Sequence, residues 1–163
     1  MRKIHSSFAI VLIACSAHCA WAWSGKVTYV TDGDTVWVQP AQGGRPVKIR
    51  IQGIDAPEIC QAGGAAARAA LKSRVLEQTV SISPKRLDDY GRVLANVDWQ
   101  GQDIGRWMVS TGHAWSYSYR RNPGPYAAEQ SQAAAARRGL FAGSAAENPR
   151  RFRQRHGSCH SGA

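Results

Sequence analysis

The chain is short of acidic residues, and this shortage gives it a strongly positive charge. Its 163 residues contain 11 Asp and Glu against 21 Lys and Arg, a formal net charge of +10. Such an excess favours a polyanionic partner, either nucleic acid or an anionic membrane surface, and is also compatible with a role in solubility alone. No basic amphipathic helix with a bulky apolar face is evident, which argues against the membrane surface.

Long apolar runs are also missing. The run from Phe8 to Ala14 is too short to span a bilayer. It follows a basic start and precedes Ala20-Trp21-Ala22, with small residues at the positions that a signal peptidase reads. We therefore expect residues 1–22 to be a signal peptide and the mature protein to be exported, periplasmic or secreted, without stable membrane insertion. The alternative is a lipoprotein anchored at Cys15, because Leu12-Ile13-Ala14-Cys15 resembles a bacterial lipobox.

Cysteine is scarce, and only two of the four cysteines, Cys60 and Cys159, lie beyond the expected signal peptide. In an oxidising compartment we expect them to form a disulfide, which would hold the basic C-terminal tail beside residues 55–58. Two free thiols are the alternative. A zinc site is not indicated, because two cysteines are too few and His113, His156 and His160 lack the spacing of zinc ligands around the acidic residues.

One stretch, Val47 to Glu58, joins a strand to a cluster of charge. Apolar and polar residues alternate from Val47 to Gln52, which predicts a half-buried strand with Arg50 on the face opposite the isoleucines. Asp55 and Glu58 follow on a turn stiffened by Pro57. An arginine on a rigid strand beside two carboxylates can hold a phosphate next to a metal ion, although a solvated acidic turn is the simpler interpretation of this stretch alone.

The remaining pattern predicts an α+β protein with one domain over residues 23–143 and a basic C-terminal tail over residues 144–163. Asp32-Gly33 between two β-rich runs predicts a hairpin. An alanine-rich helix follows Gly63-Gly64, with Ala67, Leu71 and Val75 on one stripe that suits close packing on a sheet. A five-stranded barrel of the OB type with about three helices fits this order. The predicted strands cover residues 23–31, 35–38, 47–52, 79–87 and 93–99, and the predicted helices begin at Ala65, Asp103 and Tyr126.

Three motifs now stand in order: Asp32-Gly33-Asp34-Thr35, then Arg50 with Ile54-Asp55-Ala56-Pro57-Glu58, then Asp89-Tyr90-Gly91-Arg92. Together they resemble the staphylococcal (thermonuclease-type) nuclease family, over about Trp23 to Phe141. Each motif alone is weak, but the ordered set is specific. The resemblance implies a nuclease that is dependent on Ca²⁺, acts on DNA and RNA with little sequence preference and leaves 3′-phosphate ends. A non-catalytic nucleic-acid-binding module on the same barrel is the alternative.

The resemblance also implies a role for each matching residue. Asp34, Asp55 and the carbonyl of Ala56 match the Ca²⁺ ligands, and Asp32 matches an acid next to them. Arg50 and Arg92 match the catalytic arginines, and Glu58 matches the proposed general base. Tyr90, Tyr117 and Tyr119 match tyrosines around the nucleotide. Ala56 stands where the family usually has threonine, which should cost little because the ligand is a backbone oxygen.

The flanking residues leave some choices open. Arg92 could instead pair with Asp88 or Asp89 as a turn cation. Trp115 and one of the tyrosines could stack on bases or pack in the core. We expect the tail from Pro149 to Arg155 to lie on the surface as a non-specific electrostatic aid to binding, and the protein to act as a monomer.

Overall fold

The computed structural model of the protein describes residues 22–143 and 146–159. Residues 1–21, which contain Cys15 and nearly all of the predicted signal peptide, lie outside the described residues. None of the helices in the described part of the chain has the length and apolarity needed to cross a bilayer.

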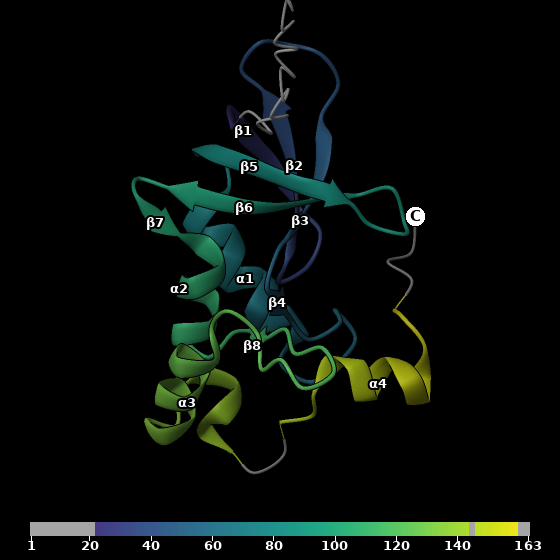
Figure 1. Cartoon of the computed structure of the whole chain (residues 1–163), viewed down its shortest axis with the longest axis vertical. Helices are drawn as coiled ribbons and strands as arrows, with labels where there is room; N and C mark the ends of the chain where they lie inside the picture. Colours follow the sequence, from purple (N-terminus) through teal and green to yellow (C-terminus); the bar gives the residue numbers. More distant parts are fainter. Residues whose placement is uncertain (1–21, 144–145, 160–163) are drawn as a thin grey trace, which may run out of the picture.

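Within the described residues, five strands close into a barrel (Figure 1). The sheet order is β3-β2-β1-β5-β6, and a parallel pairing of β3 with β6 closes it. This architecture confirms the predicted α+β barrel of the OB type. The barrel strands are β1 (Trp23–Val30), β2 (Thr35–Pro40), β3 (Val47–Ile51), β5 (Thr79–Leu87) and β6 (Val93–Trp99), and β7 (Gln102–Asp103) extends the sheet beyond β6.

The barrel interior is filled by the apolar residues that alternate along the strands. Val27, Val36, Ile49 and Ile82 are fully buried. Burying one such side chain contributes about 1.5–3 kcal/mol relative to leaving it exposed. The polar residues between them therefore project from a rigid wall, and the side chains of β3 that face away from the core are held in place by this packing.

Helices cover one end of the barrel. Helix α1 (Gly64–Val75) packs inward through Ala67, Leu71 and Val75, as the sequence predicted. Helix α2 (Ile104–Ser110) begins after Asp103, whose side chain accepts a hydrogen bond from the Arg106 N–H at 3.0 Å. Helix α3 (Ala127–Ala135) packs on α2, and the short 3₁₀ turn η1 (Gly139–Ala142) follows it.

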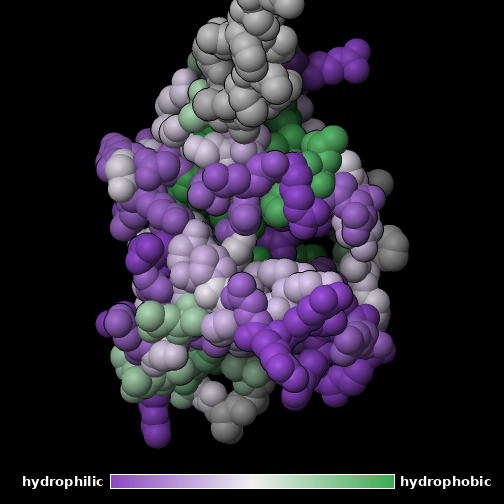
Figure 2. All heavy atoms as spheres, viewed as in Figure 1, coloured by the Kyte–Doolittle hydropathy of each residue, from purple (hydrophilic) through white to green (hydrophobic). Residues whose placement is uncertain are grey.

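Besides the short elements β7 and η1, the structure contains two features that the sequence did not predict. The first is a two-stranded pairing of β4 (Ile54–Asp55) with β8 (Trp115–Ser116), apart from the barrel sheet. The second is helix α4 (Pro149–His156), in the stretch predicted as a surface tail. Arg150, Arg151 and Arg155 of α4 are exposed. In Figure 2 the surface is hollowed between the barrel and the strongly hydrophilic region over α4.

Candidate active site

Arg50 projects from β3 on the face opposite Ile49 and Ile51, which are buried in the core. Its guanidinium is held where the chain turns out of the strand, because Nη1 donates to the carbonyl oxygens of Ile51 at 3.3 Å and Ile54 at 3.1 Å. The Arg50 side chain is only 13% exposed. The planar fork is therefore fixed in one orientation, as the strand pattern of the sequence requires.

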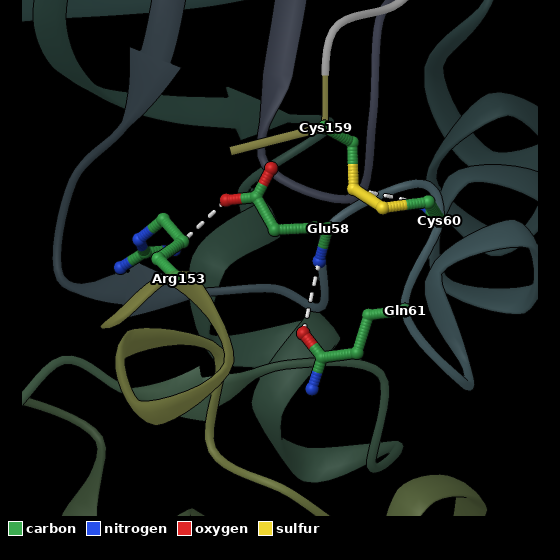
Figure 3. Close-up of a disulfide and its surroundings, with 5 residues drawn as sticks. All are labelled: Glu58, Cys60, Gln61, Arg153 and Cys159. Atoms are coloured by element: carbon green, nitrogen blue, oxygen red, sulfur yellow. Dashed lines mark hydrogen bonds and ion pairs between the residues drawn. A yellow bond between two sulfur atoms is a disulfide. The ribbon is translucent and has the colours of Figure 1, made fainter. Parts of the chain in front are cut away.

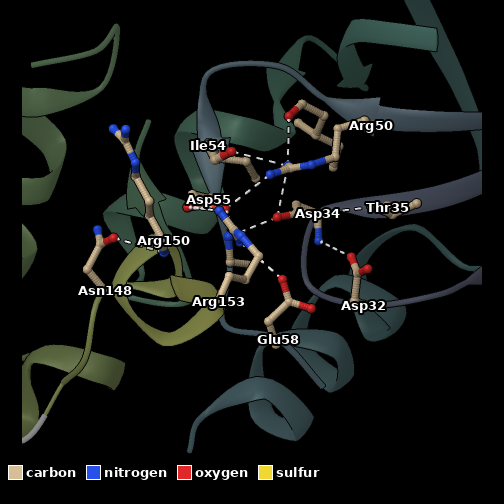
Figure 4. Close-up of polar contacts among 12 residues, drawn as sticks. Asp32, Asp34, Thr35, Arg50, Ile54, Asp55, Glu58, Asn148, Arg150 and Arg153 are labelled. Atoms are coloured by element: carbon tan, nitrogen blue, oxygen red, sulfur yellow. Dashed lines mark hydrogen bonds and ion pairs between the residues drawn. The ribbon is translucent and has the colours of Figure 1, made fainter. Parts of the chain in front are cut away.

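Two buried carboxylates contact this guanidinium from separate turns (Figure 4). Arg50 Nη1 lies 2.8 Å from Asp34 Oδ2, and Arg50 Nη2 lies 3.2 Å from Asp55 Oδ1. Asp34 follows β1, whereas Asp55 ends β4, and both residues are almost fully buried. The structure thus brings together Asp34, Arg50 and Asp55, three of the residues predicted to form the site.

The loop that carries Asp34 is fastened to the turn that carries Asp55. Asp34 Oδ2 accepts a hydrogen bond from the Ala56 N–H at 2.9 Å, and Asp34 Oδ1 accepts one from the Thr35 hydroxyl at 3.0 Å. At Gly33, an added Cβ would lie 2.6 Å from the Cβ of Ala56 and 2.7 Å from the Cβ of Ala67, so only glycine permits this close approach.

Asp32 lies beside Asp34, and the role that the resemblance implies for it stays a prediction. Its Oδ1 accepts a hydrogen bond from the Asp34 N–H at 3.0 Å. Burial, followed by the nearby Asp34 charge, raises the pKa of Asp32 to about 7. Burial also raises the pKa of Asp55, although a hydrogen bond from Arg153 and the charge of Arg50 act in the opposite direction. Carboxylates in such surroundings favour a bound cation.

Glu58 is held at the start of the loop that leads to α1. Its N–H donates to Gln61 Oε1 at 3.2 Å, and its carbonyl accepts from the Gln61 N–H at 2.9 Å. Gly64 packs so closely against this turn that an added Cβ would lie 1.9 Å from the Glu58 carbonyl oxygen. The Glu58 side chain is 20% exposed, at the open edge of the cluster.

Helix α4 places Arg153 in this cluster. The prediction that the whole stretch from Pro149 to Arg155 lies on the surface is therefore wrong for Arg153. Arg153 contacts both oxygens of Asp55, with Nη2 to Oδ2 at 3.0 Å and Nη1 to Oδ1 at 3.1 Å, and its Nη1 lies 3.1 Å from Glu58 Oε1. The sequence does carry a signal for the start of this helix, because Asn148 followed by Pro149 is a typical N-cap and first helical residue. The expected Cys60–Cys159 disulfide placed the basic tail beside residues 55–58, but no sequence pattern singled out Arg153 among the arginines of that tail.

A disulfide joins Cys60 to Cys159 and holds the end of the chain beside this turn (Figure 3). The two Cα atoms are 5.9 Å apart, across a sequence separation of 99 residues. Gln61 strengthens the connection, because its Nε2 donates to the carbonyl of Glu147 at 2.6 Å. The stretch after residue 145 is thus placed beside residues 55–61, as expected from pairing these cysteines.

Arg92 lies in a different setting from the other charged residues of the site. Its Nε contacts Asp88 Oδ2 at 2.7 Å, and its N–H donates to Asp88 Oδ1 at 2.9 Å. Among the described residues, no hydrogen bond or ion pair joins Arg92 to Asp34, Asp55 or Glu58. The alternative pairing with Asp88 is therefore the one the structure contains.

The sheet register nevertheless keeps Arg92 near the cluster. Leu94 is the partner of Arg50 in the parallel β3–β6 pair. Arg92 directly precedes β6, two residues before Leu94, so the register keeps its backbone close to that of Arg50. The role predicted for Arg92 stays a prediction.

The three predicted substrate tyrosines are all exposed, but they lie in different places. Tyr117 shares a shallow pocket with Asp55, and the pocket is completed by Ser116, Ser118, Asn148 and Arg150. Tyr90 is 82% exposed on the turn before β6, with the Arg92 guanidinium 5.3 Å from its ring centre. Tyr119 lies on the loop after β8, under Arg120. Trp115 is a core residue and packs edge-on against Phe141.

The oxygen donors of this site fit a hard divalent cation. Asp34 and Asp55 present two buried carboxylates that contact one guanidinium, and oxygen ligands of this kind suit Ca²⁺. In residues 22–143 and 146–159, no three His, Cys, Asp or Glu side chains gather into a metal-binding group. A cation here would therefore rely on the two aspartates together with backbone oxygen and solvent.

Comparison with known proteins agrees with this geometry. The model of the family described as staphylococcal nuclease homologue matches residues 48–142. The chain belongs to this family. It is a nuclease of the staphylococcal type, and hence a hydrolase. The match includes Arg50, Asp55, Glu58 and Arg92, whereas Asp34 and helix α4 lie outside it.

Curated relatives give the same assignment over more of the nuclease chain. A Haemophilus influenzae protein named an uncharacterized endonuclease is 34% identical over 144 residues, covering 88% of this chain and 79% of its own. A Shigella flexneri protein named micrococcal nuclease is 36% identical over 125 residues, covering 71% of this chain and 70% of its own. An Escherichia coli protein, also named an uncharacterized endonuclease, is 35% identical over 118 residues, covering 72% and 76%.

Proposed function

We propose that this nuclease is an exported, Ca²⁺-dependent enzyme that cleaves DNA and RNA with little sequence preference and leaves 3′-phosphate ends. The observation that carries the proposal is the contact of one fixed guanidinium, Arg50, with two buried carboxylates, Asp34 and Asp55. Hydrolysis of a phosphodiester gathers negative charge on the phosphate oxygens. A cation and an arginine fixed beside each other stabilise that charge.

In this proposal Asp34, Asp55 and the carbonyl of Ala56 hold the Ca²⁺. When bound, the ion supplies charge neutralisation at a phosphate oxygen. Asp34 is kept in position by the N–H of Ala56, so the predicted ligands belong to one connected unit. Asp32 holds this unit from behind through the Asp34 N–H.

Glu58 accepts the proton of the attacking water in this proposal. It lies at the open edge of the cluster, where its partly exposed carboxylate can reach solvent. Arg50 and Arg92 bind the phosphate oxygens as planar forks, which lysine cannot imitate. Arg92 must exchange its contact with Asp88 for the substrate, and its exposed fraction of 24% leaves it free to do so.

The contacts available to a nucleic acid around this cluster carry little sequence information. Tyr117 lies beside Asp55 in the shallow pocket and can stack on any base, and Tyr90 and Tyr119 offer further exposed rings. The positive charge of the chain attracts the phosphate backbone irrespective of sequence. These features support cleavage of both DNA and RNA.

Export to the periplasm or the medium is part of the proposal, with a lipoprotein anchored at Cys15 as the alternative route. The basic and apolar N-terminal residues support export. The Cys60–Cys159 disulfide supports it too, because such bonds persist in oxidising compartments.

One assay tests the enzymatic core of this proposal. The purified protein is incubated with single-stranded DNA, duplex DNA and RNA in Ca²⁺, and then in excess chelator, beside the Asp55→Asn variant as a control. We expect degradation in Ca²⁺ and none in the other two conditions. Products with 5′-hydroxyl ends accept a label from polynucleotide kinase without prior dephosphorylation, which identifies the end chemistry. Binding without cleavage in every tube would instead identify a nucleic-acid-binding module.

A further inference from the structure

Arg153 contacts Asp55, which is also a proposed ligand of Ca²⁺. Both carboxylate oxygens of Asp55 accept hydrogen bonds from its guanidinium, at 3.0 and 3.1 Å, and Glu58 accepts a third at 3.1 Å. Figure 4 shows the Arg153 side chain pointing from α4 into the space among Asp55, Asp34 and Glu58, while Arg150 points away from it. Arg153 therefore places a positive charge against a proposed metal ligand.

Helix α4 is held against the site by contacts at both of its ends. At the N-terminal end, Gln61 Nε2 donates to the Glu147 carbonyl and Pro149 is buried. At the C-terminal end, the chain continues to Cys159, which is bonded to Cys60. Cys60 is two residues from Glu58 in sequence, so the disulfide and the Arg153 contacts fasten α4 to the same turn (Figure 3).

The electrostatics of this arrangement favour the bound arginine. All three of its hydrogen bonds go to carboxylate oxygens, and hydrogen bonds between two charged groups are stronger than those between neutral groups. An oxygen engaged by a guanidinium has less electron density to offer a cation, and a second positive charge within a few ångströms repels that cation in a partly buried site. The Arg153 side chain is 29% exposed, so its guanidinium can move from the site into solvent.

We propose that Arg153 is an intramolecular competitor for the divalent cation at Asp55, so that helix α4 sets the Ca²⁺ concentration at which the site fills. This inference rests on the proposed Ca²⁺ site. Binding of the ion displaces the guanidinium from Asp55 toward solvent. The disulfide keeps the competitor at a high effective concentration, because it prevents α4 from leaving the turn together with Arg153.

The test is the Ca²⁺ affinity of the full chain, measured by isothermal titration calorimetry in the absence of substrate. Three variants accompany the parent protein: Arg153→Met, Arg151→Met and Asp55→Asn. Arg151 is an exposed arginine of the same helix, so its removal lowers the net charge equally without freeing Asp55. We expect Arg153→Met to bind Ca²⁺ about tenfold more tightly or better, and Arg151→Met to change the affinity by less than about threefold.

The failures of the two proposals differ in this experiment. Equal affinities of Arg153→Met and Arg151→Met, with binding lost in Asp55→Asn, would overturn the competition and leave the Ca²⁺ site intact. Unchanged binding in Asp55→Asn, or no binding in any protein, would overturn the Ca²⁺ site and the competition with it.

A double-mutant cycle tests the part assigned to the disulfide. Replacing Cys60 and Cys159 together by alanine should tighten Ca²⁺ binding in the parent, and should change it little in the Arg153→Met background. An equal gain in both backgrounds would show that the disulfide acts on the site independently of Arg153, and would overturn the tether. Circular dichroism before each titration checks that the variants are folded.

Discussion

Arg50→Lys separates the geometry of the guanidinium from its charge. Arg50 uses Nη1 for Asp34 Oδ2 and for the carbonyls of Ile51 and Ile54, and Nη2 for Asp55 Oδ1. A lysine ammonium keeps the charge but is a single point with three donors. It can stay with one carboxylate and one or two carbonyls, and it cannot span the two carboxylates as the planar fork does.

The contacts give a magnitude for each effect. The substitution puts at risk one charge-assisted hydrogen bond, to Asp55, and one buried ion pair, with Asp34. The retained charge offsets part of this loss, so we expect the free energy of unfolding to fall by about 2–4 kcal/mol. The fork is also the proposed donor to the phosphate oxygens. Removing one preorganised donor of this kind lowers kcat by at least about 10²-fold.

The assay is the rate of DNA hydrolysis in saturating Ca²⁺ and substrate, together with urea unfolding of the same samples. Arg68→Lys is the matched control, because Arg68 on α1 also bonds a carbonyl and a side-chain oxygen, those of Val30 and Tyr29, away from the acidic cluster. We expect that control to keep its turnover. If folded Arg50→Lys retained kcat within about threefold of the parent, the argument from fork geometry would be refuted.

Three further outcomes follow from the structure. Arg92→Lys should lower kcat at least about 10²-fold. It should lower the free energy of unfolding by less than about 1 kcal/mol, because the partly exposed pair of Arg92 with Asp88 contributes little to folding. A variant with the turnover of the parent would exclude Arg92 from the site. Because the pKa of Asp32 is raised to about 7 in the folded protein, the free energy of unfolding should fall as pH rises from about 4 to 7. The Asp32→Asn variant should therefore be more stable than the parent by over about 1 kcal/mol at pH 8 and equally stable near pH 3. Parallel profiles of stability against pH for the two proteins would contradict this. Tyr126→Phe removes a 2.8 Å bond to Asp103 and should cost about 1–2 kcal/mol in urea unfolding, whereas Tyr119→Phe, at an exposed ring, should cost nothing measurable.

The agreement between sequence and structure is best where a short-range pattern decides the outcome. Alternation along Val47 to Ile51 placed the isoleucines in the core and Arg50 outside, and the structure has this arrangement. The stripe of Ala67, Leu71 and Val75 identified the inward face of α1 in the same way. Such patterns can be read directly because the side-chain periods of strands and helices are fixed by the backbone.

The family resemblance, carried by the three motifs, also implied that Asp34 and Asp55 belong to one site with Arg50. Asp34 and Asp55 come from turns at the ends of β1 and β4, and each turn had a clear signal in Asp32-Gly33 and in Pro57. Barrel closure then brought these turns to one end of the sheet. Asp34 borders a predicted strand, whereas Asp55 ends β4, a strand that the sequence did not predict.

The sequence by itself determined the barrel strands, their inward residues and the turns that carry the acids, since each depends on neighbours within a few positions. The tertiary structure alone decided which carboxylates the arginine side chains contact. Arg153 reaches Asp55 across 98 positions, and Arg92 turns to Asp88 instead of the cluster. A long arginine side chain can reach several carboxylates. The carboxylate that it contacts depends on how distant segments of the chain pack together.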